Sequence, residues 1–360
     1  MRIAVAMSGG VDSSVAALML LEQGHDVFGL TMRLWSCGDD EEGPKVCCGP
    51  ESVRSAARVA STLGITHHAL SMHRSFEDAV VSHFVAEYGA GRTPNPCVRC
   101  NELMKFEELL ARARGLGADA LATGHHARVR RGASGAPELW RALDADKDQT
   151  YFLYRVTREQ LDHVLFPVGE LQKDDVRARA REAGLAVADR AESQDVCFVP
   201  GGDLETFLRE RAPHAVRPGA IVDREGTVIG EHRGFGLYTV GQRKGLALSR
   251  PRPAYVLAVN PEANTVVVGD DEDLLSQSLE AHDAHWIPGE APGTEFRADA
   301  KVRSTAAAAP CSVRVDGDRV AVLFDAPQRA LAPGQSVVLY RGDAVLGGAT
   351  IARGSIAGSA

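Results

Sequence analysis

The segment from Ser8 to Ser14 reads Ser-Gly-Gly-Val-Asp-Ser-Ser and combines the residue types that bind phosphate. It lies between a short apolar run at residues 3–7 and a helical pattern at residues 13–23. The glycines let the backbone approach a ligand, and the helix offers N–H groups and the positive end of its dipole. Asp12 adds a carboxylate for Mg²⁺ or for a nucleotide's amine or water shell. The segment predicts a phosphate loop, although it matches neither G-x-x-x-x-G-K-[ST] nor G-x-G-x-x-G.

The cysteines form the second set of chemically capable residues, and their number is odd: Cys37, Cys47, Cys48, Cys97, Cys100, Cys197 and Cys311. In a cytosolic chain such a set favours catalysis or metal binding over structural disulfides. Cys97 and Cys100 form a CxxC before a helix expected from about Glu102, and the helix dipole and Arg99 favour the thiolate form. With Cys197 they supply three thiols, whereas a structural zinc site needs four ligands. We rank sulfur or redox chemistry first, iron–sulfur binding second and structural zinc third.

The first half of the chain alternates strand and helix patterns. Strands are expected over residues 3–7, 26–34, 67–72 and 118–123, and helices over 13–23, 51–63, 75–88 and 105–114. This order predicts an α/β fold, a doubly wound parallel sheet with helices on both faces. Ligands of such folds bind at the carboxyl ends of the strands, where Met32 and Gly124 lie. Both residues are therefore expected to complete the nucleotide site.

The pattern changes near residue 200, where Pro200, Gly201 and Gly202 form a joint. After a short helix at 203–211, short β-like runs with turn residues follow at 220–222, 255–259, 265–268, 319–324 and 336–340. Such runs predict small β domains or barrels. We expect a catalytic domain over residues 1–200, a small central domain over 201–273 and a β-barrel-like domain over 274–360.

The 360-residue chain has a formal net charge of −8, which argues against a general DNA-coating protein. A shaped RNA met by a local basic face remains compatible with this charge. The candidate patches are 128–131 and 242–244, which alone are interpreted as solvated loops. No apolar run approaches the roughly 20 residues that span a bilayer, and the N-terminus lacks the pattern of a signal peptide. We expect a cytoplasmic protein without a membrane partner.

The phosphate loop resembles the pyrophosphate loop of the ATP-pyrophosphatase superfamily, whose members split ATP to AMP and pyrophosphate while adenylating a substrate. Further segments resemble, in chain order, the tRNA-specific 2-thiouridylase (MnmA) family. They lie at 91–101, 122–125, 147–149, 165–169, 193–198, 241–246 and 333–336. The ordered set is very specific, and the resemblance spans almost the whole chain.

This resemblance implies that the protein replaces O2 of the wobble uridine of tRNA with sulfur. The uracil O2 attacks the α-phosphorus of ATP, and the resulting adenylate is a good leaving group. Cys197 carries a persulfide, and Cys100 attacks it to release sulfur and leave a Cys100–Cys197 disulfide for reduction. Direct attack of the persulfide sulfur on C2 is the alternative. The implied ATP site, with Mg²⁺, comprises Ala6, Met7, Ser8, Gly9, Gly10, Val11, Asp12, Ser13, Met32 and Gly124.

The implied partners are tRNA and a sulfur donor, either a cysteine desulfurase or a sulfur-relay protein. The target base leaves its stack to reach the site. Asn95, Pro96 and Cys97 align with the triplet that contacts this base in the family. The residues that align with tRNA contacts are His125, Lys147, Asp148, Gln149, Arg303, Ser304 and Gln335.

Three departures from the family pattern matter. Many members have Asp at the position of Cys97, so polar contact with the base is in doubt there. The replacement creates a trio, Cys97, Cys100 and Cys197, that could hold a [4Fe–4S] cluster with one open iron. Glu102 stands where the family often has a basic residue. In the stretch 301–305, which is commonly aromatic and basic, only Arg303 keeps an obvious role.

Other functions are compatible with parts of this pattern. Another ATP-pyrophosphatase, such as an amidating synthetase, would split ATP without tRNA and would need neither the CxxC nor the distant cysteine. A non-catalytic RNA-binding or iron–sulfur scaffold would bind tRNA without releasing pyrophosphate, but the intact phosphate loop argues against it. A thiolase for another tRNA base, such as cytidine, fits the long β-rich C-terminal half less well.

Overall fold

The computed structural model describes residues 1–34, 49–190, 196–250 and 252–354 of the chain. The questions raised by Cys37, Cys47 and Cys48, and by the segment 192–195, lie outside these described residues.

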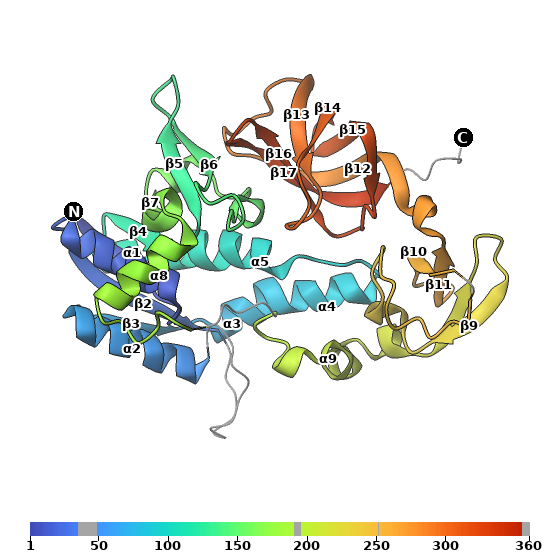
Figure 1. Cartoon of the computed structure of the whole chain (residues 1–360), viewed down its shortest axis with the longest axis horizontal. Coiled ribbons are helices and arrows are strands. Elements are labelled where there is room, and N and C mark those ends of the chain that lie inside the picture. Colours follow the sequence, from blue (N-terminus) through green and yellow to red (C-terminus); the bar gives the residue numbers. More distant parts are fainter. Residues whose placement is uncertain (35–48, 191–195, 251, 355–360) are drawn as a thin grey trace.

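A parallel five-stranded sheet, in the order β3-β2-β1-β4-β7, organises the N-terminal half (Figure 1). Ile3 and Val5 pack with the helices on one face, whereas Ala4 between them packs into the core on the other face. This alternation follows from the two-residue period of a strand. The doubly wound fold is therefore confirmed. The strands are β1 (Arg2–Ala6), β2 (Asp26–Arg33), β3 (His67–Ser71), β4 (Ala120–Thr123) and β7 (Val164–Leu165).

Three helices cover the face of Ile3 and Val5: α1 (Val11–Glu22), α2 (Pro50–Leu63) and α8 (Lys173–Glu182). Two longer helical rods cover the other face. The first joins α3 (His73–Phe76), a π-helical segment η1 (Glu77–Val81) and α4 (Ser82–Gly89). The second joins α5 (Pro96–Arg99), a π-helical segment η2 (Cys100–Leu109) and α6 (Leu110–Gly115). The π-helical winding at Cys100 is of a kind that often marks functional sites.

The second rod corrects one expectation. Its start was expected near Glu102, but the helix begins at Pro96. Proline suits the first position of a helix because its fixed φ is helical and its missing N–H would be unpaired there anyway. Cys97 and Cys100 therefore lie inside the first turns of the rod and not in a loop before it.

The C-terminal part is a β-barrel. Strands β12-β15-β14-β13-β16-β17 are hydrogen-bonded in this order, and a further pairing of β12 with β17 closes the ring. Closure leaves no exposed sheet edge. The strands are β12 (Leu275–Trp286), β13 (Glu295–Lys301), β14 (Ala309–Asp316), β15 (Arg319–Arg329), β16 (Ser336–Arg341) and β17 (Ala344–Gly354).

A hairpin from the N-terminal half joins this barrel. Strands β5 (Ala127–Arg131) and β6 (Pro137–Arg141) pair with each other, and Trp140 of β6 pairs with Ala344 of β17 (Figure 1). The interpretation of residues 128–131 as a solvated loop was therefore wrong. Arg128 is buried, and its guanidinium lies 3.2 Å from the Asp343 carboxylate. The hairpin fixes the barrel to the N-terminal half of the molecule.

A small four-stranded sheet, in the order β10-β11-β8-β9, lies between these parts in sequence. Its strands are β8 (Gly219–Val222), β9 (Val228–His232), β10 (Tyr255–Asn260) and β11 (Thr265–Gly269). The remaining helices are η3 (Thr150–Phe152), α7 (Arg158–Leu161), η4 (Pro167–Glu170), η5 (Pro200–Gly202), α9 (Leu204–Arg211), η6 (Pro213–Val216), η7 (Phe235–Leu237) and η8 (Asp271–Leu274). Among the described residues, no helix is long and apolar enough to cross a membrane.

Candidate functional site

The loop from Ser8 to Gly10 turns tightly between β1 and α1. Gly9 has a positive φ of 72°, and a Cβ there would lie 2.6 Å from the Ser52 carbonyl oxygen of α2, so only glycine fits. The Gly9 carbonyl oxygen accepts hydrogen bonds from Ser55 Oγ (3.1 Å) and from the Arg190 guanidinium (2.9 Å). Within the loop, Ser8 N donates to Ser13 Oγ at 3.3 Å. The loop is thus held from three sides.

Gly124 at the end of β4 lies directly against the start of α1. A Cβ at Gly124 would be 2.4 Å from Ser13 N and 2.6 Å from Asp12 C, so a side chain there would collide with backbone. Of the other expected ATP residues, Ala6 and Met7 lead into the loop, and the Met7 carbonyl oxygen accepts from Thr31 Oγ1 at 2.6 Å. Met32 lies on β2, and its side chain is buried in the hydrophobic core. Its contact with ATP stays a prediction.

Asp12 lies in the first turn of α1, and two cationic or polar partners hold it. Lys173 Nζ donates to both carboxylate oxygens at 2.7 Å, and His126 Nε2 lies 3.2 Å from Oδ1. Burial alone would raise the pKa of Asp12, but the hydrogen bonds from His126 and Lys173 and the Lys173 charge together lower it below its ordinary value. Asp12 is therefore an anion fixed beside the phosphate loop.

His125 connects the phosphate loop with the second helical rod, which carries Cys97 and Cys100. Its Nδ1 lies 2.7 Å from Thr123 Oγ1, and its Nε2 lies 3.2 Å from Lys105 Nζ on η2, the segment that begins at Cys100. Burial lowers the pKa of His125 well below its ordinary value, and the Lys105 charge acts in the same direction. The phosphate loop and the second rod therefore both contact one short segment, residues 123–125.

The two cysteine segments pack on the same helical rod. Phe198, which follows Cys197, packs edge-to-face on Phe76 and Phe84, with ring centroids 5.6 and 5.0 Å apart. Arg99, which precedes Cys100, donates to the Ala79 carbonyl oxygen at 3.4 Å. Cys100 and Cys197 are both half-buried against one core cluster. The rod that spans residues 73–89 therefore brings residues almost a hundred positions apart into one region.

Cys97, Cys100, Cys197 and Cys311 are thiols in the described part of the chain. Across the described ranges, no three His, Cys, Asp or Glu side chains are grouped so that they could hold a metal ion. A [4Fe–4S] cluster on Cys97, Cys100 and Cys197 stays a prediction. Cys311 is buried in the barrel, where its Sγ donates to the Ala298 carbonyl oxygen, and burial raises its pKa to about 12. This thiol is inert.

The residues aligned with tRNA contacts serve mainly structural hydrogen bonds in this structure. Asp148 Oδ1 accepts from the Ala142 backbone, and Gln149 Oε1 accepts from the His126 backbone. Gln335 donates to the Thr93 carbonyl oxygen at 2.8 Å, which ties the barrel to the loop before Asn95 and Pro96.

Arg303 also makes a structural bond, because its guanidinium donates to the Arg329 carbonyl oxygen. Ser304 is half-buried beside it, and Lys147 lies on the same turn as Gln149. The tRNA contacts of all these residues stay predictions.

Sequence reasoning missed Lys173, His126, Arg190 and Arg155. Arg155 forms ion pairs with Glu102 (2.8 Å) and with Asp283 of β12 (2.9 Å). The acidic residue at position 102 thus has a structural explanation, because it ties η2 to the barrel through Arg155. Lys173 belongs to no motif that the sequence analysis identified, and His126 adjoins His125 but shows no sequence link to Asp12.

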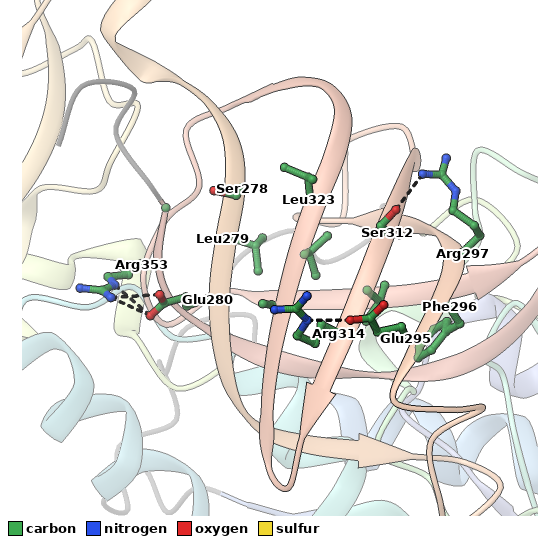
Figure 2. A pocket seen from close by; sticks show the side chains of 14 residues that line it. Ser278, Leu279, Glu280, Glu295, Phe296, Arg297, Ser312, Arg314, Leu323 and Arg353 are labelled. Atoms are coloured by element: carbon green, nitrogen blue, oxygen red, sulfur yellow. Dashed lines mark hydrogen bonds and ion pairs between the residues drawn. The ribbon is translucent and has the colours of Figure 1, made fainter. Parts of the chain in front are cut away.

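The barrel carries a separate groove of about 840 Å³. Its arginines are paired within the barrel: Arg314 with Glu295 at 2.9 Å and Arg353 with Glu280 at 2.9 Å, while Arg297 donates to Ser312 at 3.1 Å (Figure 2). Because these charges are largely compensated and no cysteine lines the groove, it offers neither an anion site nor sulfur chemistry.

The family models that match the chain cover its three parts. A model described as "tRNA methyl transferase HUP domain" matches residues 1–201, "tRNA methyl transferase PRC-barrel domain" matches 205–270, and "Aminomethyltransferase beta-barrel domain" matches 276–351. The descriptions mention methyl transfer, whereas the full-length relatives are named for thiolation.

Curated relatives match the chain over nearly its whole length. A protein of Magnetococcus marinus named tRNA-specific 2-thiouridylase MnmA is 48% identical, over 97% of this chain and 98% of the relative. Proteins of the same name from Heliobacterium modesticaldum and Roseiflexus castenholzii are 49% and 46% identical, over 98% of this chain and 92% and 99% of the relatives. Similarity at this level and coverage, together with the match of the first model to more than half of the residues, establishes the family. The chain belongs to the tRNA-specific 2-thiouridylase (MnmA) family.

Proposed function

We propose that this protein is an ATP-dependent tRNA sulfurtransferase that converts the wobble uridine of tRNA to 2-thiouridine. The observation that carries the proposal is the similarity of 46–49% over nearly the whole chain to relatives named tRNA-specific 2-thiouridylase. The site geometry supports this proposal, because the phosphate loop and the helical rod that carries Cys97 and Cys100 contact the same segment, 123–125.

The first step activates the base. The uracil O2 attacks the α-phosphorus of ATP, the bond to pyrophosphate breaks, and O2 becomes part of an adenylate. Gly9, Gly10 and the N-terminus of α1 bind the phosphates through backbone N–H groups, and Ser8 and Ser13 add hydroxyls. Asp12 would hold Mg²⁺ together with phosphate oxygens, as nucleotide sites with one carboxylate do, and the metal would neutralise charge on the leaving group.

The second step delivers sulfur. Cys197 carries a persulfide received from a cysteine desulfurase or a relay protein. The Cys100 thiolate attacks the Cys197 sulfur, a Cys100–Cys197 disulfide forms, and hydrosulfide leaves. Hydrosulfide attacks C2 of the adenylated base, AMP leaves with the former O2, and a thiol reductant restores both cysteines.

The tRNA is held over this site by the second rod and the barrel. Asn95, Pro96 and Cys97 contact the target base from the start of the rod, and Gln335 orders their loop through Thr93. We assign catalysis to residues 1–200, tRNA binding to the barrel of residues 274–360 and a connecting role to residues 201–273. The reaction takes place in the cytoplasm, where tRNA and the sulfur donor meet.

The test is thiolation of unmodified tRNA by anaerobically purified protein with Mg-ATP, a cysteine desulfurase and cysteine. Thiolated tRNA is retarded on a mercury-containing gel. We expect a retarded band that requires ATP, and we expect Cys100→Ser and Cys197→Ser each to abolish it. Cys311→Ser is the matched control and should leave the band unchanged, because Cys311 lies in the barrel core. Splitting of ATP to AMP and pyrophosphate without tRNA and without any band would identify a small-molecule synthetase instead.

A further inference from the structure

The CxxC of the second rod contains one thiol to which the mechanism above gives no covalent step. Cys97 is exposed in the first turn of the rod, whereas Cys100, one turn later, is half-buried. Residues three positions apart in a helix lie on one face, with Cβ atoms about 5–6 Å apart. A disulfide needs Cβ atoms about 3.5–4.5 Å apart, so a small shift in the first turn is enough to join the two sulfurs.

The rod is anchored just behind this turn. Asn101 Nδ2 donates to the Phe152 carbonyl oxygen at 2.9 Å. Glu102 forms an ion pair with Arg155 at 2.8 Å. The N-cap residue Asn95, by contrast, makes no side-chain capping hydrogen bond within the described part of the chain. The turn that holds Cys97 is therefore an uncapped helix end, which frays more easily than the anchored part behind it.

The exposure of the thiols differs in a way that matters for reduction. Cys100 and Cys197 both pack against the hydrophobic core, and both are half-buried. The disulfide that forms between them on sulfur release is therefore partly shielded from a bulky reductant. Thiol–disulfide exchange requires direct attack of a thiolate on one of the two sulfurs, so its rate depends on access. Cys97, which is exposed, offers a sulfur that a reductant can reach.

We propose that Cys97 is a resolving thiol that moves the disulfide from the half-buried pair to the surface. The inference rests on the proposed function, because it concerns the disulfide that sulfur release leaves behind. The Cys97 thiolate, favoured by the positive end of the rod's dipole, attacks the Cys100 sulfur. A Cys97–Cys100 disulfide forms, the Cys100–Cys197 bond breaks, and Cys197 leaves as a thiolate.

This exchange needs no additional oxidant, because one disulfide replaces another. Cys197 is then free of its disulfide and ready for the next persulfide. The thiol reductant of the proposed reaction reduces the exposed Cys97–Cys100 disulfide and closes the cycle.

The alternative is that Cys97 only contacts the target base. Cys97→Asp separates the two roles, because aspartate keeps a polar group toward the base but has no sulfur. Cys311→Ser is the matched control, since it also removes one thiol, but from the core of the barrel.

The experiment maps disulfides after one round of reaction. The full-length protein is loaded with persulfide by a cysteine desulfurase and freed of excess donor. It then receives tRNA and Mg-ATP anaerobically, without a reductant. The reaction is quenched with excess N-ethylmaleimide, and the protein is digested with trypsin and analysed by mass spectrometry without reduction. Trypsin cleaves after Arg99, so a Cys97–Cys100 disulfide joins peptides 93–99 and 100–105.

We expect the wild type and Cys311→Ser to yield these joined peptides and alkylated Cys197, in an amount equal to the 2-thiouridine formed. We expect Cys97→Asp to yield the Cys100–Cys197 disulfide instead. A protein dithiol should reduce the wild-type disulfide at least about tenfold faster than that of Cys97→Asp, because only the former is exposed. A small phosphine, which needs little access, should reduce both at similar rates.

A wild-type map with a Cys100–Cys197 disulfide and alkylated Cys97 would overturn the inference. Formation of 2-thiouridine without any disulfide would overturn it as well. The wild-type map decides alone if Cys97→Asp does not fold. Absence of 2-thiouridine in the wild type would instead contradict the proposed function.

Discussion

His125 shows how one residue can have a structural role in this structure and an expected role with tRNA. It is 9% exposed and lies between Phe106 and Phe166, with ring centroids 5.9 and 6.0 Å away. Burial and the nearby charge of Lys105 lower its pKa, so the folded protein keeps the ring neutral. A neutral ring can accept from Lys105 and exchange a hydrogen bond with Thr123 at the same time.

This pKa shift predicts how stability depends on pH. Above the ordinary pKa of 6.5 both folded and unfolded states carry neutral His125, and its contribution is fully present. As pH falls below 6.5 the unfolded chain binds a proton that the folded chain does not, so stability is lost. We expect His125→Gln to remove about 1 kcal/mol of the stability difference between about pH 7.5 and pH 5.5. Urea unfolding at both pH values measures it.

The control for this prediction is His214→Gln, since the side chain of His214 is exposed. It should leave the pH dependence of the unfolding free energy unchanged. If His125→Gln has the same pH dependence as the wild type, His125 titrates normally in the folded protein and the account of its burial is contradicted.

At the residue scale the sequence predicts what is encoded in consecutive positions. The Ser8–Ser14 string and the CxxC are short local patterns whose residue types indicate phosphate binding and sulfur chemistry. The role of Cys197 is predicted only from the family resemblance. Lys173, His126 and Arg190 could not be predicted, because each reaches the phosphate loop from a separate element and only folding brings them to Asp12 and Gly9. Asp12 was expected to face metal or nucleotide, and its protein partners were not foreseen.

At the scale of the secondary-structure elements, the close contact between the end of β4, at Gly124, and the start of α1, at Ser13, positions the phosphate loop. Since a Cβ at Gly124 would lie 2.4 Å from Ser13 N, we expect Gly124→Ala to push β4 and the loop apart. ATP affinity should fall at least about tenfold, because a misplaced loop loses several backbone hydrogen bonds to phosphate. Titration of the variant with α,β-methylene-ATP measures the effect.

Gly115→Ala is the matched control, because nothing lies within 4 Å of a Cβ built at Gly115 in α6. It should bind the analogue as tightly as the wild type. Wild-type affinity in Gly124→Ala would mean that the loop moves without cost, and the close approach would then have no functional meaning.

The elements of the first half follow well from the sequence because their apolar periodicities are long and local. The start of the second rod was placed too late, since the turn residues at 93–96 conceal a proline at the first helical position. The β5–β6 hairpin was missed for a different reason. Its pairing with β17 joins residues about two hundred positions apart, and the alternation of Ala127 and Val129 with arginines is too short to stand out from a charged loop.

At the scale of the whole molecule, the barrel is tied to the N-terminal half at several points. Gln335 donates to the Thr93 carbonyl oxygen, Arg155 links Glu102 to Asp283, and β6 pairs with β17. Two of these ties meet the second rod, at Glu102 and just before its start at Thr93, and the third runs through the β5–β6 hairpin, which follows β4 in the chain.

The central claim is that ATP activates the uracil oxygen and that cysteine-borne sulfur replaces it. The most direct measurement uses tRNA whose uridines carry a heavy oxygen isotope at O2, incubated with the protein, Mg-ATP and the sulfur-donating system. Mass spectrometry then follows AMP and the tRNA nucleosides. The account predicts 2-thiouridine together with an equal amount of AMP that carries the heavy oxygen in its phosphate. Formation of 2-thiouridine with unlabelled AMP would contradict it.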